Sequence, residues 1–459
     1  MLALHRPLGT GRERLGLPGP QILELVVHGR ISHDPEGYRR LGTGREPHLP
    51  CAAVAAGAPY LEPGRIGSLT LRNRLVRAST SETMAAPDGA GTPALANLYG
   101  TLAAGGAGLL LTGHIYVERR GQASANQPGL YDDRLVESMV QVTEAVHARG
   151  GRIFAEIGHA GSQTMLPEVG PIAPSPTANE MYGLQPREAT PEDITDVIAA
   201  FGHAARRARE AGFDGVHIHG GNGYLISEFS SPITNVRTDG WGGDAERRGR
   251  FVLAVYDSVR RAVGDDYCVT ARIGIGDSIP GGLEASESVE RVRLLAERGL
   301  DAVEVSYGIM KSYLENIRTY VAVGAAQAAR NGLVQRLVKP EGPEAYYRHF
   351  ARAVKEAVDI PVILVGGIRT TQTMADVISS GDADFLAMSR PFIREPDLVN
   401  KLAAGRTGTV ECVSCNMCLV HDGFDPLRCW RTSPAAVAAH VYTHHIRGRL
   451  PRRFRSERD

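Results

Sequence analysis

The sequence predicts an α/β fold: a closed (β/α)8 barrel of the TIM type, with extended βα loops and a short C-terminal Cys-rich segment. Eight short apolar runs recur between residues 75 and 388, with helical patterns between them. Strands that alternate with helices form a parallel sheet, and eight such units close into a barrel. The alternative is an open, doubly wound sheet. No Gly-x-Gly-x-x-Gly motif follows the first run, so the dinucleotide-binding fingerprint of that sheet is missing and the barrel is favoured.

The predicted strands follow one another in chain order. They are residues 75–78, 108–112, 152–157, 215–219, 268–272, 302–306, 361–365 and 384–388. The clearest helical patterns between them are residues 133–149, 191–211 and 286–298. Two connections are unusually long: the Pro-rich loop 158–190 after the third strand and the loop 307–342 after the sixth. Long loops at the carboxyl ends of barrel strands commonly shape a substrate pocket.

The two ends of the chain differ from the barrel region in composition. Residues 1–57 are rich in Arg, Gly and Pro, and they contain the hexapeptide Leu-Gly-Thr-Gly-Arg-Glu at residues 8–13 and again at 41–46. Two copies are too few for a solenoid, so we predict either a disordered extension or a stretch that results from an upstream start codon. The sequence then predicts the barrel over residues 58–405, a Cys-rich segment over 406–432 and a disordered basic tail over 433–459.

Charge and hydropathy exclude several classes of protein. The 459 residues include 51 basic and 51 acidic side chains, so there is no electrostatic basis for binding nucleic acid or a membrane surface. No apolar run approaches the roughly 18–20 residues of a membrane span. The apolar run at residues 22–27 is short and contains Glu24, which is not typical of a signal peptide. We therefore expect a cytoplasmic protein without nucleic-acid or membrane partners, and the sequence leaves open whether it forms a homo-oligomer.

The last two predicted strands are followed by groups that suit an anion. Gly366-Gly367 follows the seventh strand, and Ser389-Arg390 follows the eighth. In barrels, the loops after strands seven and eight often hold a phosphate. Glycines let backbone N–H groups face the anion, and an arginine adds a bidentate donor. The predicted ligand is a phosphate-bearing substrate or a mononucleotide such as FMN.

The end of the fourth strand carries the polar groups with the clearest catalytic potential. The stretch His219-Gly220-Gly221-Asn222-Gly223-Tyr224 places three polar side chains just past a strand, where barrels have their active sites. His219 and Asn222 can both donate to one carbonyl oxygen, and Tyr224 can donate a proton. His217 lies two residues earlier on the same side of the strand, and we assign it a structural role.

Four cysteines cluster after the predicted barrel, at Cys412, Cys415, Cys418 and Cys429. Thiols stay reduced in the cytosol, so this spacing favours metal ligation over disulfides. Four thiolates suit a [4Fe–4S] cluster or a structural zinc ion, and a segment without metal is the third possibility.

Several segments together resemble the Old Yellow Enzyme family of FMN-dependent NADH:flavin oxidoreductases and ene-reductases. The matching segments are residues 66–76, 105–108, 159–161, 212–215, 219–224, 231–232, 237–239, 242–243, 366–367 and 390–391. The most specific stretch is 212–251, which contains His219-x-x-Asn222-Gly-Tyr224. The cysteine spacing is similar to that of one branch of this family, which includes 2,4-dienoyl-CoA reductases and trimethylamine dehydrogenase and carries a [4Fe–4S] cluster.

The resemblance implies a role for each site residue. Residues 78–81 would lie against the flavin ring, although the family usually has Pro and Met where this chain has Ser79 and Thr80. Arg272 would lie beside N1 and O2 of the flavin, where reduction leaves negative charge. The implied cofactor-binding residues are Ala78, Ser79, Thr80, Ser81, Glu156, Arg272, Gly366, Gly367, Ser389 and Arg390, and the implied catalytic residues are His219, Asn222 and Tyr224.

Glu156, in the third predicted strand, departs from the family pattern, which generally has Gln at this position. A glutamine amide can donate to one flavin atom and accept from another, whereas a carboxylate only accepts. An ionised Glu156 would disfavour the anionic reduced flavin. We therefore expect either a lowered flavin potential or a protonated Glu156, unless the side chain turns toward another donor.

The resemblance implies an NAD(P)H-dependent flavin oxidoreductase. NAD(P)H would reduce FMN, and the hydride would then pass to the C=C bond of an α,β-unsaturated carbonyl compound, a small-molecule substrate resembling an enone. One alternative is an FMN/iron–sulfur dehydrogenase of the amine-oxidising type, and another is a catalytically impaired flavin-binding protein. The pair His219 and Asn222 favours a carbonyl ligand and hence the first interpretation.

Overall fold

Eight parallel strands form a closed barrel in the computed structural model, which describes residues 57–177, 184–310, 344–419, 423 and 425–441. In order around the barrel they are β3 (Leu75–Arg77), β4 (Leu109–Leu111), β6 (Ile153–Gly158), β9 (Gly215–Gly220), β10 (Cys268–Gly276), β11 (Ala302–Tyr307), β12 (Val362–Val365) and β13 (Phe385–Met388). The ring closes because β13 pairs in parallel with β3. Each predicted strand coincides with one of these strands, so the predicted (β/α)8 barrel is confirmed.

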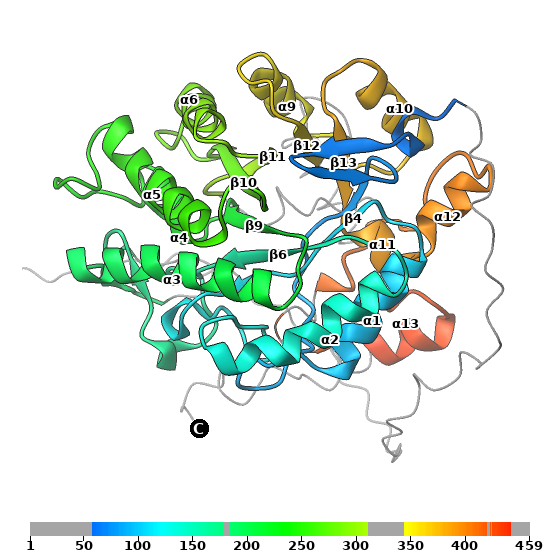
Figure 1. Cartoon of the computed structure of the whole chain (residues 1–459), viewed down its shortest axis with the longest axis horizontal. Helices are drawn as coiled ribbons and strands as arrows, with labels where there is room; N and C mark the ends of the chain where they lie inside the picture. Colours follow the sequence, from blue (N-terminus) through cyan, green and yellow to red (C-terminus); the bar gives the residue numbers. More distant parts are fainter. Residues whose placement is uncertain (1–56, 178–183, 311–343, 420–422, 424, 442–459) are drawn as a thin grey trace, which may run out of the picture. The chain divides into compact units, whose positions relative to one another are not determined.

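Helices surround the strands, as Figure 1 shows. They are α1 (Pro93–Ala104), α2 (Val136–His147), α3 (Pro191–Glu210), α4 (Leu225–Ser230), α5 (Ala245–Val263), α6 (Ala285–Glu297), α9 (Arg348–Lys355), α10 (Thr371–Ser379), α11 (Arg390–Arg394), α12 (Leu398–Ala403) and α13 (Pro434–Val441). Short 3-10 turns lie at Pro59–Leu61, Arg119–Gly121, Asp133–Leu135 and Pro167–Val169. The predicted helices correspond to α2, α3 and α6. None of the helices in the described part of the chain combines the length and apolar character needed to cross a bilayer.

Polar residues at the expected positions start several of the helices. At α3 the Thr190 hydroxyl accepts from the N–H of Asp193, and the Asp193 carboxylate accepts from the N–H of Thr190 at 2.8 Å. At α5 the Asp244 carboxylate accepts from the N–H of Arg247 at 2.8 Å. Such caps satisfy N–H groups that have no partner inside the helix, and each typically stabilises a helix by about 1 kcal/mol.

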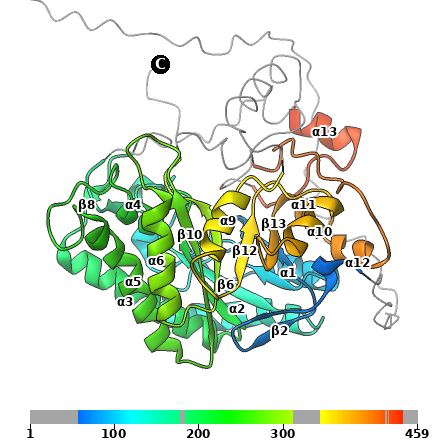
Figure 2. The same ribbon diagram turned by 90° about the horizontal axis from the view of Figure 1, so that it is seen from above.

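A hairpin covers the amino-terminal end of the barrel. Its antiparallel strands are β1 (Gly64–Ile66) and β2 (Leu69–Leu71). Ile66 is fully buried against an apolar layer inside the barrel that includes Phe154, Cys268 and Phe385. Figure 2 shows this hairpin at one end of the barrel and the segment leading to α13 at the other. The amino-terminal half of the barrel is therefore packed and apolar, and the opposite end is left for chemistry.

The inward positions closer to the carboxyl ends of the strands are polar. Successive side chains on a strand alternate between the inside and the outside of a barrel. Two residues beyond Phe154 lies Glu156, and two residues beyond Ala302 lies Glu304, and both carboxyl groups are fully buried. Strand register places Glu156 beside His217, and Arg272 beside Glu304. The fold thus concentrates buried charge directly beneath the carboxyl-terminal end of the barrel.

Several smaller elements complete the described structure. Strand β5 (Ile115–Tyr116) pairs with β6 outside the ring, and β7 (Ile172–Ala173) pairs with β8 (Arg187–Glu188) within the long loop after the third barrel strand. The predictions for residues 1–56 and 442–459, and most of the long loop after the sixth barrel strand, lie outside the described residues. The tail that was predicted to be disordered from residue 433 begins instead with helix α13.

Candidate active site

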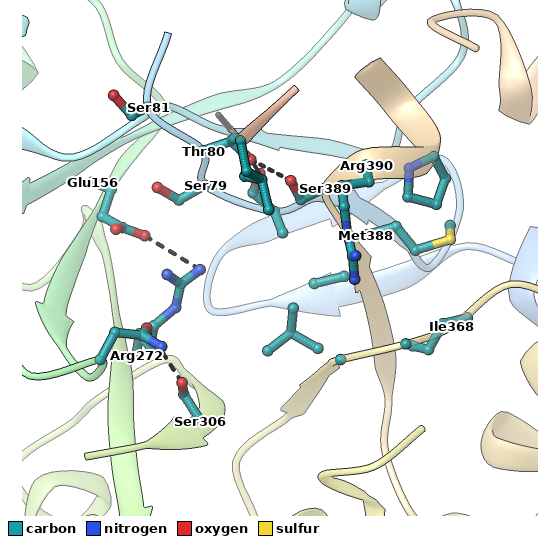
Figure 3. A pocket seen from close by; sticks show the side chains of 18 of the residues that line it. Ser79, Thr80, Ser81, Glu156, Arg272, Ser306, Ile368, Met388, Ser389 and Arg390 are labelled. Carbon is teal, nitrogen blue, oxygen red and sulfur yellow. Dashed lines mark hydrogen bonds and ion pairs between the residues drawn. The ribbon is translucent and has the colours of Figure 1, made fainter. Parts of the chain in front are cut away.

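One cavity at the carboxyl ends of the barrel strands gathers all of the predicted cofactor-binding and catalytic residues. It is lined by Ala78, Ser79, Thr80, Ser81, Glu156, His219, Asn222, Tyr224, Arg272, Gly366, Gly367, Ser389 and Arg390. They come from loops and strand ends far apart in the chain, and Figure 3 shows the side chains of several of them turned toward a common space. The sequence-based grouping of these residues into one site therefore agrees with the geometry.

The glycine and arginine groups lie together at one side of this cavity. Gly366 and Gly367 both have a positive φ, of 110° and 74°, and a Cβ on Gly366 would lie 2.7 Å from the ring of Tyr346. The hydroxyls of Thr80 and Ser389 are 2.6 Å apart, which links the loops after the first and last barrel strands (Figure 3). The two glycines, the two hydroxyls and Arg390 line the same cavity, which is the arrangement that the predicted phosphate site requires.

Arg390 connects this side of the cavity to the Cys-rich segment. Its guanidinium donates to the Asn416 side-chain oxygen at 2.5 Å. Arg369 lines the same cavity and donates to the carbonyl oxygen of Cys412 at 2.9 Å. Both arginines therefore hold the segment that follows the barrel against the predicted phosphate site.

Arg272 forms the centre of a buried group of charges. Its guanidinium lies 3.0 Å from Glu304. It lies 3.6 Å from Glu156, and Figure 3 marks this second contact with a dashed line. Burial raises the pKa of Glu156 above its usual range, although Arg272 and His217 act against the effect. Burial also acts on Glu304, but Arg272 and His217 outweigh it and hold the pKa of Glu304 below its usual range. The two carboxyl groups that share one guanidinium are therefore electrostatically unequal.

Close packing against Arg272 determines the conformation of the loop after β9. A Cβ on Gly220 would lie 2.8 Å from the Arg272 carbonyl oxygen, and one on Gly221 would lie 3.2 Å from the Arg272 side chain. Asn222 then adopts a left-handed conformation with φ 60°, which asparagine tolerates better than most residues. Its N–H donates to the Tyr307 carbonyl at 2.8 Å. The loop can thus approach β10 only with glycines before Asn222.

The Asn222 amide is held with its donor unused. The Ser306 hydroxyl donates to the Asn222 side-chain oxygen at 3.3 Å. This contact leaves Nδ2, which is buried and has no hydrogen-bond partner among the described residues, as a donor in the cavity lining. A buried amide N–H without a partner costs free energy, so the group gains from a ligand that accepts from it.

Three aromatic rings form one wall of the cavity. The ring of His219 lies 4.6 Å from that of Tyr224 and 5.8 Å from that of His114, and His114 lies 4.9 Å from Tyr224. Burial, followed by the charge of Arg272, lowers the pKa of His114 to about 4. Burial likewise holds the pKa of His219 well below its usual value. Both imidazoles are therefore neutral at physiological pH.

His114 is a site residue that the sequence reasoning missed. It lies two residues past the end of the second predicted strand, so its place at a strand's carboxyl end was the available signal. Other lining residues that were not predicted are Ser306, Tyr346, Val365, Ile368, Arg369, Ala387, Met388, Pro391, Ser414 and Leu419.

Comparison with known proteins identifies the family. Residues 60–408 match the NADH:flavin oxidoreductase / NADH oxidase family. The chain belongs to this family. It is 36% identical over 388 residues to an NADH oxidase from Thermoanaerobacter brockii, and the match covers 83% of this chain and 56% of that protein.

Solved structures with the same fold include relatives of the Old Yellow Enzyme type. A 2-naphthoyl-CoA reductase in complex with 2-naphthoyl-CoA has a TM-score of 0.73 at 25% identity, with coverage of 83% of this chain and 58% of that one. An old yellow enzyme homologue from Zymomonas mobilis has a TM-score of 0.63 at 26% identity, with coverage of 78% of this chain and 95% of that one. The predicted Old Yellow Enzyme family membership is confirmed. The chain spans little more than half of the NADH oxidase and of the CoA-ester reductase.

The residues of the cavity suit FMN, the cofactor of this family. Arg390 and the Gly366-Gly367 backbone offer donors for a phosphate. Arg272, on the side of the cavity formed by Glu156 and His219, offers a cation for the edge of a ring that becomes negative on reduction. The neutral loop of residues 78–81 between them can lie against an apolar ring face. The donor set therefore fits a phosphorylated flavin.

The four C-terminal cysteines line a second cavity of about 300 Å³, next to the first. Arg390 and Ser414 border both cavities. Burial raises the pKa of Cys418 to about 12 and also raises that of Cys412, so both thiols are protonated as the structure stands. Among the described residues no three potential ligands are arranged to hold a metal ion. The four thiols thus line one cavity, but as placed they do not form a metal-ligating group among the described residues, and no reaction step is assigned to a metal.

Proposed function

We propose that this chain is an FMN-dependent oxidoreductase that uses NAD(P)H and reduces the C=C bond of an α,β-unsaturated carbonyl compound. Family membership supports the flavin and the reductant. The choice of substrate rests on two hydrogen-bond donors in the same cavity as Arg272, one a neutral imidazole and the other an amide without a partner among the described residues. These are the imidazole of His219 and the amide Nδ2 of Asn222, which line the same cavity.

The chain's own residues account for the steps on the substrate. His219 and Asn222 would donate to the carbonyl oxygen and stabilise the negative charge that develops there. When bound, FMN supplies the hydride chemistry, in which a hydride is accepted from NAD(P)H and then delivered to the β-carbon. The π electrons of the C=C bond move toward the carbonyl as that bond to hydrogen forms. Tyr224, whose ring lies against His219, would give a proton to the α-carbon and complete the reduction.

The same donors weigh against the amine-oxidising alternative. A protonated amine would meet the guanidinium of Arg272 and the N–H donors of Asn222, which repel or fail to satisfy a cation. A carbonyl oxygen accepts from all of these groups. The enone reading therefore fits the polarity of the site better.

A two-stage stopped-flow experiment tests the proposal. The purified holoprotein is first reduced with NADPH or NADH without oxygen, and the loss of flavin absorbance is followed. The reduced protein is then mixed with cyclohexenone, with saturated cyclohexanone as the matched control. Reoxidation by the enone and not by the ketone is expected. Failure of every enone to reoxidise the flavin would overturn the ene-reductase assignment, and a purified protein without flavin would overturn the flavin assignment itself.

We further propose that the four cysteines bind a [4Fe–4S] cluster, on the support that their thiols line one cavity. Binding would require the cysteine segment to rearrange, because its described residues lack a metal-ligating arrangement. Iron and acid-labile sulfide are measured in protein purified without oxygen. About four of each per chain support a cluster. Zinc in their place, or no metal, overturns the proposal.

A further inference from the structure

Two buried carboxyl groups share the single guanidinium of Arg272, and they do so unequally. Glu304 has the shorter contact, 3.0 Å against 3.6 Å for Glu156. Glu304 also lies 3.2 Å from Nε2 of His217, whereas Glu156 lies 3.8 Å from it. Two carboxylates cannot both ionise cheaply in a buried site with one cation. Glu304 is therefore the ionised member of the pair, and Glu156 is the one that retains a proton.

Glu156 also lies beside His219, which can accept the proton that Glu156 retains. Its Oε1 lies 3.1 Å from Nδ1 of His219, and both atoms are buried and lack a hydrogen-bond partner among the described residues. The side chain of Ser79 also faces Glu156 (Figure 3). Because Nδ1 is the buried nitrogen, Nε2 is the ring nitrogen of His219 that is left to face the cavity.

The position of one proton decides what His219 can do. A neutral imidazole carries a single N–H. If Nδ1 donated that hydrogen to an ionised Glu156, Nε2 would be bare and could not donate to a carbonyl oxygen. If Glu156 instead donates to Nδ1, the ring's own hydrogen is on Nε2, where a carbonyl can accept from it.

The third arrangement, an imidazolium beside a carboxylate, is disfavoured by the surroundings. Burial lowers the pKa of His219, and Arg272, His114 and His217 lower it further. The groups that act on the Glu156–His219 pair are Ser79, His114, His217, Tyr224, Arg272 and Glu304, together with the buried ion pair of Arg77 and Glu82. Arg272 is the fixed cation among them, and it repels a second positive charge on the ring.

We propose that Glu156 is a positioning residue, which holds a proton and donates it to Nδ1 of His219, so that the ring presents Nε2–H to the substrate. The tautomer follows from the distances around Glu156. Its consequence for a carbonyl ligand rests on the proposed function. Carbonyl binding then depends on the proton held by the pair, and the dissociation constant should rise by up to tenfold per pH unit once that proton is lost.

Nitrogen-15 NMR of the histidine rings tests the tautomer without any substrate or turnover. The sample is oxidised holoprotein at neutral pH, and a His219→Asn spectrum assigns the ring. A bare Nδ1 and a protonated Nε2 are expected in the wild type and in Glu156→Gln, because a glutamine amide can donate to Nδ1 as well. Glu156→Leu should lose this fixed state. A protonated Nδ1 in the wild type would overturn the proposal.

A ligand titration against pH provides a second, independent readout. Cyclohexanone is titrated into the oxidised holoprotein, and the dissociation constant is read from the flavin spectrum. Wild-type affinity should fall at high pH, and Glu156→Gln should show no such fall, because its amide hydrogens do not titrate. Equal pH dependence in both proteins would contradict the proposal.

Glu304→Gln is the matched variant, because it removes the negative charge that contacts Arg272 and His217 rather than His219. With Glu304 neutral, Arg272 should ionise Glu156 instead, so binding should weaken at neutral pH and its pH dependence should move to lower pH. An unchanged profile would contradict the proposal. If cyclohexanone binds to none of these proteins at any pH, the proposed function fails, and the NMR result still decides the role of Glu156.

Discussion

Removal of the Asn222 side chain tests whether its amide donates to the carbonyl oxygen of the substrate. Nδ2 of Asn222 is a buried donor without a partner among the described residues, and the Ser306 hydroxyl donates to the oxygen at the other end of the amide. If it donates to the carbonyl oxygen where charge develops, Asn222→Ala loses one of two such donors. Loss of a donor of this kind typically lowers kcat by about 10²–10³, or about 2.7–4 kcal/mol of transition-state stabilisation.

The backbone at this position supplies an internal control. Asn222 has φ 60°, a conformation that alanine adopts at a cost of about 1–2 kcal/mol and glycine adopts freely. Asn222→Ala should therefore be less stable than Asn222→Gly by about 1 kcal/mol, measured by urea denaturation. The two variants should lose enone reduction equally, because both lack the amide. A difference in stability without a difference in rate separates the chemical role from the structural one.

The assay isolates the step in question. The flavin is reduced with dithionite, so that NAD(P)H binding plays no part, and its reoxidation by saturating cyclohexenone is followed in a single turnover. Both variants should be slower than the wild type by at least about a hundredfold. A folded Asn222→Gly protein that reoxidises within about threefold of the wild-type rate would refute the role of Asn222.

Three further outcomes are expected. Tyr224→Phe keeps the ring that packs against His219 but lacks the hydroxyl, so single-turnover enone reduction should fall by about 10²–10⁴, and a rate near that of the wild type would exclude Tyr224 as the proton donor. Arg390→Ala should weaken FMN binding by about tenfold or more in a fluorescence titration. The control is Arg394→Ala, which lies on the same helix but outside the first cavity and should leave FMN binding unchanged. Equal effects of the two substitutions would show that Arg390 does not bind the phosphate. Burial raises the pKa of Glu228 from 4.5 to about 8. Between these two pH values the folded protein keeps a proton on Glu228 that the unfolded chain has released. The free energy of unfolding is therefore highest at low pH and falls as the pH rises to about 8. Relative to the wild type, the free energy of unfolding of Glu228→Gln should therefore rise by up to about 1.4 kcal/mol per pH unit between pH 5 and 8, measured by urea denaturation. A difference between the two proteins that stays constant over this range would show that Glu228 is ionised in the folded protein.

The sequence was sufficient to predict the barrel and the site residues that lie at the ends of its strands. In a (β/α)8 barrel the order of strands in space is their order in the chain, so eight apolar runs determine which strand ends meet. Gly366, Arg390 and His219 could be placed around one cavity for that reason. His114 was missed because nothing in its neighbours shows that the loop after β4 turns its ring toward Tyr224.

Glu304 was missed for a different physical reason. Its strand is apolar and short, and a single glutamate in such a run reads equally well as a residue at the barrel surface. Only the register, which sets Glu304 directly beside Arg272, shows that its carboxyl group faces the interior. Contacts between strands distant in the chain are not encoded in local pattern, and the electrostatics of this site depends on one of them.

The pairing of Glu304 with Arg272 changes the meaning of Glu156. From the sequence, a carboxylate at that position is a liability, because it would place negative charge beside the flavin edge that becomes negative on reduction. In the structure Glu304 already balances Arg272, so an ionised Glu156 would leave the group with a net negative charge. A protonated Glu156 keeps the group neutral and also gives His219 the Nε2–H that a carbonyl requires. One proton thus satisfies both demands, and a loss of that proton should impair flavin reduction and ligand binding over the same range of pH.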